Sequence, residues 1–259
     1  MNFYSILSLL MALGVFITGI VTSAEHYEHF FDLPALLIVL GGTFAALSIS
    51  FQLNRVLSLM KIVFSRVILG HRHDYSKVIA ELMTMSEAYR KGDSIDSFMA
   101  NTKDDFLREC LQLIQDNVLE GEELFEVLDN RVENLNFHYM EEANRFKSAG
   151  KYPPAFGLMG TTIGMVVLLS SIGGADALRK IGPAMSVCLT ATLYGVTFAN
   201  FFFIPVGENL VDSSRETYLK NKIIVEGLSL MLAKTNPIIL AEKLNSFLKP
   251  HDRLDWKKS

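Results

Sequence analysis

Four long apolar segments dominate the pattern of hydrophobic and polar positions along the chain. A helix needs about 20 mostly apolar residues to cross the hydrocarbon core of a bilayer. Four segments have about this length and contain no charged residue and no histidine: Phe3–Val21, Leu33–Phe51, Pro154–Ile172 and Pro183–Val206. The pattern therefore predicts an all-α, polytopic membrane protein with one transmembrane helix for each segment.

The polar segment 53–153 has apolar residues at the spacing of amphipathic helices. Its first predicted helix has Asp74 or Ser76 as N-cap and ends at Gly92, because short polar side chains favour helix starts and glycine favours helix ends. Two more helices are predicted after it, at Asp104–Glu120 and Glu122–Gly150. We therefore expect a helical domain here.

The chain after the fourth span is also expected to be helical. An amphipathic helix leads out of that span, Asn236-Pro237 ends it, and a short helix follows. The predicted organisation is 1–52 for the first two transmembrane helices and a short outer loop, 53–153 for a cytoplasmic helical domain, 154–207 for the last two transmembrane helices, and 208–259 for cytoplasmic C-terminal helices.

Lys and Arg are unevenly distributed, and their distribution predicts the orientation in the membrane. Residues 1–52 contain neither, residues 53–153 contain thirteen, and the chain after Val206 contains nine. The short connection between the last two spans contains only Arg179 and Lys180. Because basic residues favour the cytoplasmic side, we expect a multi-pass protein of the inner membrane with both termini in the cytoplasm. The first span lacks the basic n-region of a signal peptide and is expected to be retained.

Charge and motif spacing argue against several classes of function. The net charge of −4 gives no reason to expect a nucleic-acid partner. Cys110 and Cys188 lack metal-ligand spacing, and His71 and His73 are expected to lie in a solvated loop rather than at a metal. We find no catalytic constellation and no nucleotide-binding motif. The sequence therefore predicts a protein that is not an enzyme and has no cofactor or metal.

The last two spans contain small and hydroxyl-bearing residues at helical spacing. Gly160–Gly164 reads "GTTIG", a small-x-x-x-small pattern that lets helix backbones approach closely in lipid. A polar stripe follows one face of the fourth span: Ser186, Thr190, Thr197 and Asn200. Such residues serve either helix packing or a water-filled path inside the bundle.

Asp, Glu, Lys, Arg and His are missing from all four spans. A proton relay needs a titratable group, and a cation site usually includes a carboxylate. If the protein conducts ions, the carboxylate must therefore come from another chain.

Two prolines lie at the predicted cytoplasmic ends of the last two spans. Pro154 is near the start of the third span, where the first helical turn tolerates proline. Pro205 is near the end of the fourth span, where it removes a backbone donor and is expected to kink the helix. Both prolines are candidates for a joint between the membrane helices and the cytoplasmic domain.

Three of the spans resemble a known family. The third reads "PPAFGLMGTTIGMVVLLSSI", the fourth "IGPAMSVCLTATLYGVTFANFFFIPV" and the second "LLIVLGGTFAAL". These sequences and the predicted topology resemble the flagellar motor stator family MotA/PomA, within the MotA/TolQ/ExbB proton-channel superfamily. The resemblance covers nearly the whole chain and is looser in the cytoplasmic domain.

The resemblance implies a function and a set of partners. Such subunits form a homopentamer in the lipid membrane around a MotB-like single-span partner, whose intramembrane aspartate accepts the ion. Ion flow then turns the ring, and the cytoplasmic domain acts on a rotor switch protein of the FliG type. The missing carboxylate in this chain agrees with that arrangement.

Site residues carry over from the resemblance one by one. Thr161 matches a threonine near the ion path, and Pro154 and Pro205 match the two prolines that couple ion flow to torque. Sodium-type relatives have a Thr-Thr pair where this chain has Ala191-Thr192. We therefore include Ala191 and Thr192 in the ion pathway and favour H⁺ over Na⁺ as the translocated ion.

Arg90 matches a family arginine that engages the rotor. The acidic residue that accompanies it in the family is replaced by Phe98, and Asp93 or Asp96 is the candidate substitute. From the residues alone, an arginine at the position of Arg90 is more often a solvated charge near a helix C-terminus.

Three alternatives remain at this point. An energiser of the ExbB/TolQ type drives an envelope-spanning partner instead of a rotor, but such proteins typically have fewer spans. A membrane enzyme would need a catalytic constellation at the interface. A non-conducting scaffold would use the threonines of the spans only for helix packing.

Overall fold

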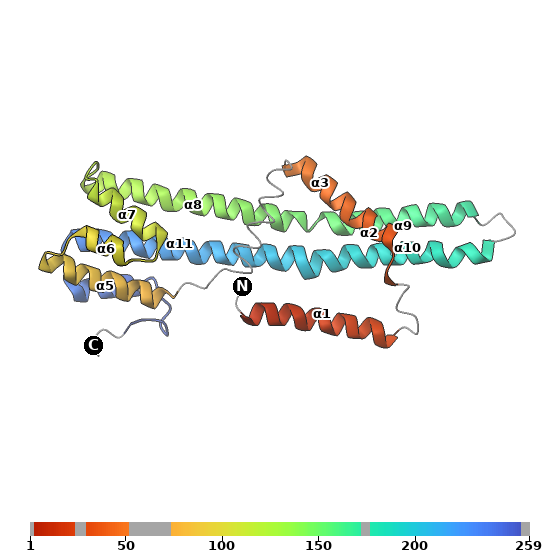
Figure 1. Cartoon of the computed structure of the whole chain (residues 1–259), viewed down its shortest axis with the longest axis horizontal. Coiled ribbons are helices and arrows are strands. Elements are labelled where there is room, and N and C mark those ends of the chain that lie inside the picture. The colour runs from red at the N-terminus through yellow and green to blue at the C-terminus, as the bar shows by residue number, and fades with distance from the viewer. Residues whose placement is uncertain (1–2, 24–29, 52–73, 172–176, 255–259) are drawn as a thin grey trace. The chain divides into compact units, whose positions relative to one another are not determined.

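Helices account for all the regular secondary structure in the residues that the computed structural model describes, which are 3–23, 30–51, 74–171 and 177–254 (Figure 1). The chain divides into two compact units. Unit 1 comprises Met1–His71 and Met140–Asp212, and unit 2 comprises Arg72–Tyr139 and Ser213–Ser259. The prediction of an all-α protein is confirmed.

Unit 1 contains the predicted spans, and two of them include a π-helical turn. Each of these turns has regular α-helix directly before and after it, so each of the two spans is one continuous helix of changing pitch. The elements are α1 Phe3–Ser23; α2 Leu33–Leu36, η2 Leu37–Gly41 and α3 Gly42–Phe51; α9 Tyr152–Ser171; and α10 Ala177–Phe198, η4 Ala199–Phe203 and α11 Ile204–Leu232.

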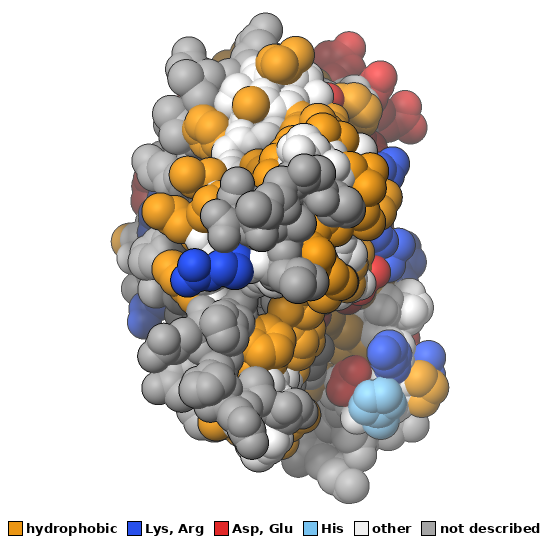
Figure 2. Space-filling model, turned by 90° about the vertical axis from the view of Figure 1, so that its right-hand side faces the viewer, with side chains coloured by type: hydrophobic (Ala, Val, Ile, Leu, Met, Phe, Trp, Pro, Cys, Tyr) orange, Lys and Arg blue, Asp and Glu red, His pale blue; other side chains and the backbone are white. Residues whose placement is uncertain are grey.

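The apolar helices have the length and the surface of membrane spans. Within the described residues, three helical stretches are long and apolar enough to cross a membrane: Leu33–Phe51 and parts of Gly121–Ser170 and Ile181–Leu232. A shorter apolar helix, Leu10–Thr22, lies within α1. Hydrophobic side chains cover large parts of the face shown in Figure 2. On α9 the exposed ones include Leu158, Ile163, Val166 and Leu169.

The helices of unit 1 pack around the pair formed by α9 and α10, which lie side by side (Figure 1). The helix of the second span contacts both of them. A small core forms where Ala35 and Val39 of that span meet Ala191 of α10. α1 contacts η4, and the rings of Phe16 and Phe201 are 5.5 Å apart.

Unit 2 has a hydrophobic core of its own, made by amphipathic helices. Fully buried side chains such as Leu82, Leu111 and Leu128 come from three of these helices, and Leu228 comes from α11. The helices are α5 Tyr75–Lys91, α6 Ile95–Asn101, α7 Asp105–Gln115, α8 Gly121–Ala149 and α12 Pro237–Asn245, of which α8, like α11, has residues in both units.

The caps of α5 agree with the sequence analysis and resolve the choice of N-cap. Asp74 is the N-cap, because its carboxylate accepts a hydrogen bond from the backbone N–H of Lys77. Ser76 instead donates its hydroxyl to the carbonyl of Asp252. Gly92 ends the helix in the left-handed region, with φ of 104°, where glycine has no Cβ to strain.

Two predictions for this unit were wrong in detail. The helix predicted at Asp104–Glu120 ends at Gln115, because Asn117 adopts a left-handed conformation with φ of 49°. The short helix α6 was not predicted, and its Phe98 is buried in the core. The predicted loop at His71 and His73 lies outside the described residues.

An ion-pair network links α8 to α11 within unit 2. Lys222 Nζ lies 3.0 Å from both Asp129 Oδ2 and Glu133 Oε1, and Tyr218 donates its hydroxyl to Glu133 Oε1 at 2.8 Å. The hydrogen bond from Lys222 lowers the pKa of Glu133, and that from Tyr218 adds to the effect. Burial acts to lower the pKa of Lys222, but the hydrogen bonds to the two carboxylates outweigh it and raise that pKa. The network therefore favours the charged form of both partners.

Candidate functional site

The interface between α9 and α10 is built from small residues. A Cβ atom on Gly160 would lie 2.5 Å from the Cβ of Ala191, which is closer than real Cβ contacts come. One turn further along, a Cβ on Gly164 would lie 2.5 Å from Cys188 Sγ. The close helix approach expected from "GTTIG" is therefore confirmed.

Two threonine hydroxyls meet inside this interface. Thr161 Oγ1 of α9 and Thr192 Oγ1 of α10 are 2.5 Å apart. Both hydroxyls also share the carbonyl of Cys188, at 2.9 Å from Thr161 and 3.4 Å from Thr192. The structure thus brings together two of the three residues predicted for the ion pathway. Their hydroxyls offer a proton donor and several oxygen lone pairs but no charge, and their role in ion flow stays a prediction.

Ala191 is adjacent to this hydroxyl pair in sequence but faces another direction. Its side chain is 0% exposed and packs against Gly160 and the second span. A larger side chain at this position would have to separate α9 from α10. Ala191 therefore contributes to helix packing in the structure, and its assignment to the ion pathway also stays a prediction.

The polar stripe of the fourth span lies apart from the hydroxyl pair. Ser186 and Thr190 line a pocket of about 340 Å³ together with Leu189, Leu193 and Phe30. Two of these five lining residues carry hydroxyls and three are apolar. The wall of the pocket is therefore only partly polar and does not form a continuous polar path.

Tyr194 is a site residue that the sequence analysis did not single out. Its hydroxyl accepts a hydrogen bond from the backbone N–H of Asp32 at 3.0 Å and donates one to the carbonyl of Phe30 at 2.6 Å. The hydroxyl therefore attaches the connection before the second span to the fourth span. The motif "LYG" holds this tyrosine, but a sequence does not show which backbone groups a phenol will meet.

The two prolines occupy different kinds of helix position. Pro154 lies in the first turn of α9, where no backbone N–H is needed, and its Cα lies close to Gly195 of α10. Pro205 is the second residue of α11, two residues after the end of η4, and the helix continues beyond it to Leu232. The expected interruption at Pro205 therefore takes the form of a wider turn, which accommodates the missing N–H without ending the helix.

Arg90 is exposed in the last turn of α5. Among the described residues it has no ion-pair partner. Asp96 instead accepts a hydrogen bond from Gln115 Nε2. The structure does not pair Arg90 with Asp93 or Asp96, and its rotor contact stays a prediction.

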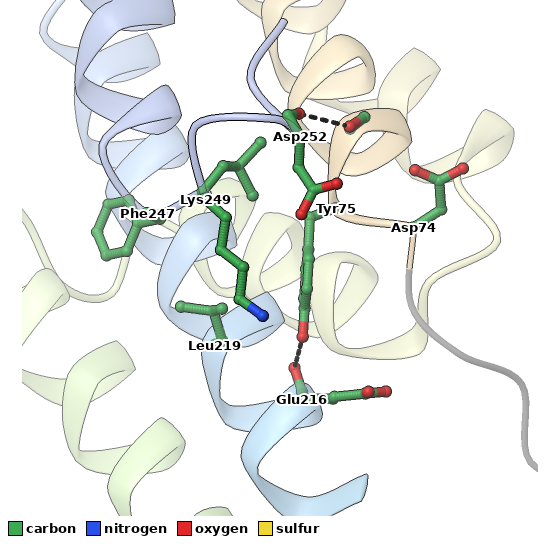
Figure 3. Close-up of a pocket in the computed structure, with 9 residues that line it drawn as sticks. Asp74, Tyr75, Glu216, Leu219, Phe247, Lys249 and Asp252 are labelled. Carbon is green, nitrogen blue, oxygen red and sulfur yellow. Dashed lines mark hydrogen bonds between the residues drawn. The ribbon is translucent and has the colours of Figure 1, made fainter. Parts of the chain in front are cut away.

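Unit 2 has a surface pocket of about 400 Å³ (Figure 3). Tyr75 crosses it and donates its hydroxyl to the carbonyl of Glu216 at 3.3 Å, and Lys249 and Asp252 also line it. Within the described part of the chain, no group of three or more His, Cys, Asp or Glu residues is placed to hold a metal ion. Burial raises the pKa of Cys110 to about 12, so its thiol is unreactive at neutral pH.

Comparison with known proteins identifies relatives over the whole length of the chain. The model of the MotA/TolQ/ExbB proton channel family matches residues 99–222. Motility protein A of Borreliella burgdorferi is 31% identical over 100% of this chain and 98% of its own length. Chemotaxis protein PomA of Vibrio alginolyticus is 25% identical over 86% of this chain and 87% of its own length.

Two solved structures share the fold. A chain of C. jejuni MotAB has a TM-score of 0.85 at 23% identity and covers 99% of this chain and 100% of its own. A chain of the flagellar MotAB stator complex from Bacillus subtilis has a TM-score of 0.85 at 22% identity and covers 98% of this chain and 99% of its own. These two likenesses confirm the fold. The 31% identity to motility protein A over the full length of both chains shows that the chain belongs to the motility protein A family, and the matching model places residues 99–222 within the MotA/TolQ/ExbB proton channel family.

Proposed function

We propose that this protein is the stator subunit of a bacterial flagellar motor and couples ion flow across the inner membrane to torque on the rotor. The observation that carries the proposal is the 31% identity to a motility protein A over the full length of both chains. The third and fourth spans support it, because they contain no charged side chain and bring two hydroxyls together at the contact of α9 and α10. Such a helix pair can line an ion path only beside a chain that supplies a carboxylate.

The ion-binding carboxylate is proposed to come from a MotB-like partner with a single span. The relatives solved as MotAB complexes support this partner. A homopentamer around that partner, both termini in the cytoplasm and contact of Arg90 with a FliG-like rotor protein belong to the same proposal. In this proposal the chain binds no cofactor.

H⁺ is the proposed coupling ion rather than Na⁺. A sodium ion needs several oxygen ligands in place of its hydration shell, whereas a proton needs only a chain of hydrogen-bonding groups. Ala191 offers no side-chain oxygen, and its methyl group already fills the contact with Gly160. The oxygens of Thr161 and Thr192 are enough to hydrogen-bond a water molecule or the protonated partner carboxylate.

Complementation tests this function. Cells lacking their own stator should swim when they express this chain with its single-span partner. Swimming should stop on addition of a protonophore and should persist without sodium. Restored swimming that requires sodium would reject the proton assignment alone, and absence of swimming despite normal membrane levels of both chains would reject the stator function.

An ion-driven energiser of the ExbB/TolQ type is the second candidate. The observation in its favour is that the matching family model is shared with ExbB and TolQ. Restoration of an energised outer-membrane function, instead of swimming, in the corresponding deletion strains would favour it.

A further inference from the structure

Within unit 1, the end of α8 lies directly against the start of α11. A Cβ atom on Gly207 would lie 2.8 Å from the Cα and the Cβ of Lys147 and 3.0 Å from its backbone nitrogen. Two of these three atoms belong to the backbone of α8, which cannot move aside as the end of a side chain can. Gly207 is therefore the residue that lets the two helices touch at this point.

Side chains on both sides of this contact hold the two helices together. The Phe146 ring lies 5.5 Å from that of Phe203 and 6.1 Å from that of Phe202. Val206 and Leu210 bury their side chains in the same cluster. On the outside, Lys147 Nζ forms an ion pair with Glu208 Oε1 at 3.3 Å. The helices are thus fixed by an aromatic cluster, a backbone contact and an ion pair within about one turn.

The contact lies immediately beside the irregular turn of the fourth span. η4 ends at Phe203, Pro205 follows, and Gly207 is two residues further on. A change in the wide turn before Pro205 moves the segment that carries Gly207. Because Lys147 rests on Gly207, the end of α8 must move with that segment.

We propose that Gly207 is a positioning residue for torque transmission, which holds α8 against α11 next to Pro205 so that movement of the fourth span reaches α8 as well as α11. This inference rests on the stator function proposed above. α8 leads through Gly150 and Lys151 into α9, so the contact joins the third and the fourth span on the same side.

A graded series of glycine-to-alanine variants tests the proposal. In Gly207→Ala the added Cβ meets backbone atoms, whereas in Gly150→Ala its nearest atoms lie at 3.2 Å and include side-chain atoms of Ile204 and Phe203. Gly182→Ala is the matched control, because nothing lies within 4 Å of a Cβ at that helical position. All three changes add the same methyl group, to a helix at Gly207 and Gly182 and to the turn between α8 and α9 at Gly150, and they differ in what that group meets.

The measurement is torque from motors in which stator units are restored one at a time. The height of each speed step gives the torque per unit, and the number of steps gives the number of assembled units. We expect Gly207→Ala to roughly halve the step height with a nearly normal number of steps, since packed interfaces do not deform continuously. Gly150→Ala should have an intermediate effect and Gly182→Ala none.

Different outcomes of this experiment would contradict the role of Gly207 and the stator function on which it rests. Normal step height in Gly207→Ala, or a loss of steps without loss of height, would overturn the positioning role. If Gly207→Ala does not assemble, Gly150→Ala decides: reduced step height supports the role and full height overturns it. No steps from the unmodified chain would reject the stator function itself.

Discussion

Thr161 and Thr192 are joined by their hydroxyls where α9 and α10 come closest, and both hydroxyls also reach the carbonyl of Cys188. At the scale of single residues this pair is the most polar point within the contact of two apolar helices. The adjacent residue Thr162 differs, because it is exposed and donates its hydroxyl to Leu158 of its own helix. The two neighbouring threonines therefore provide a site variant and a matched control.

Replacing Thr161 by valine keeps the shape of the side chain and removes the hydroxyl. The Thr192 hydroxyl then loses its partner across the interface and keeps only the carbonyl of Cys188. Loss of one such hydrogen bond costs about 0.5–1.5 kcal/mol. We expect proton flux through the assembled stator to fall by roughly tenfold or more, which corresponds to about 1.4 kcal/mol. Flux into cells, normalised to the membrane level of the protein, is the measurement.

Thr162→Val is the control for this prediction and should leave proton flux unchanged. If Thr161→Val also conducts normally, the hydroxyl pair serves helix packing alone. That outcome would support the scaffold interpretation of the span-three threonines.

At the scale of elements, the two π-helical turns distinguish spans two and four from regular helices. η4 ends two residues before Pro205, and η2 ends at Gly41, where Gly42 then leaves room for the ring of Phe156. Such turns often lie at functional sites. Only η4 is followed by a proline, so a single substitution can test whether its wide turn matters.

Pro205→Ala returns a backbone N–H to the helix. We expect the wide turn to relax toward regular α-helix, because the proline that removed the donor is gone. Membrane insertion should stay normal, whereas motor torque should fall several-fold. Tethered-cell rotation and the amount of protein in the membrane are the two measurements.

Pro237→Ala provides the comparison, since Pro237 is in the first turn of α12 and has no helical hydrogen bond to lose. It should leave torque unchanged. Full torque in Pro205→Ala would show that the proline is only a tolerated interruption.

Elements with strong local signals were predictable from the sequence. The spans follow from uninterrupted apolar length, and Asp74 and Gly92 bound α5 by local hydrogen bonding and backbone freedom. α6 was missed because its 7 residues are too few to show a helical period. The partners of Gly207 and Tyr194 could not be predicted, because they depend on which helix faces meet after folding.

At the scale of the whole molecule, unit 2 is a helical domain with its own core, and charged side chains fasten two of its long helices. The network of Lys222, Asp129, Glu133 and Tyr218 lies on the surface between α8 and α11. Because the network contains carboxylates that titrate, its contribution to stability depends on pH.

Glu133 has a lowered pKa in the folded protein because it accepts hydrogen bonds from Lys222 and Tyr218. A lowered carboxylate pKa stabilises the fold at pH values above its unfolded value of about 4.3, and this stabilisation disappears as the pH falls through the folded value. We therefore expect Glu133→Gln to have a slightly lower melting temperature than the unmodified protein at neutral pH.

The difference in melting temperature between Glu133→Gln and the unmodified protein should vanish in acid. There Glu133 of the unmodified protein is protonated in both the folded and the unfolded state. Thermal unfolding in detergent across the acid range measures this difference. Glu126→Gln, at an exposed position of α8 without an ion pair among the described residues, is the control. A constant difference at every pH would mean that Glu133 acts through packing and not through its charge.

The hydroxyl of Tyr194 has a consequence for biosynthesis. It bonds to Phe30 and Asp32, which precede it by 164 and 162 residues. The ribosome therefore completes the first two spans long before the connection between them can meet its final partner. The start of the second span can reach its native state only after the fourth span has been inserted.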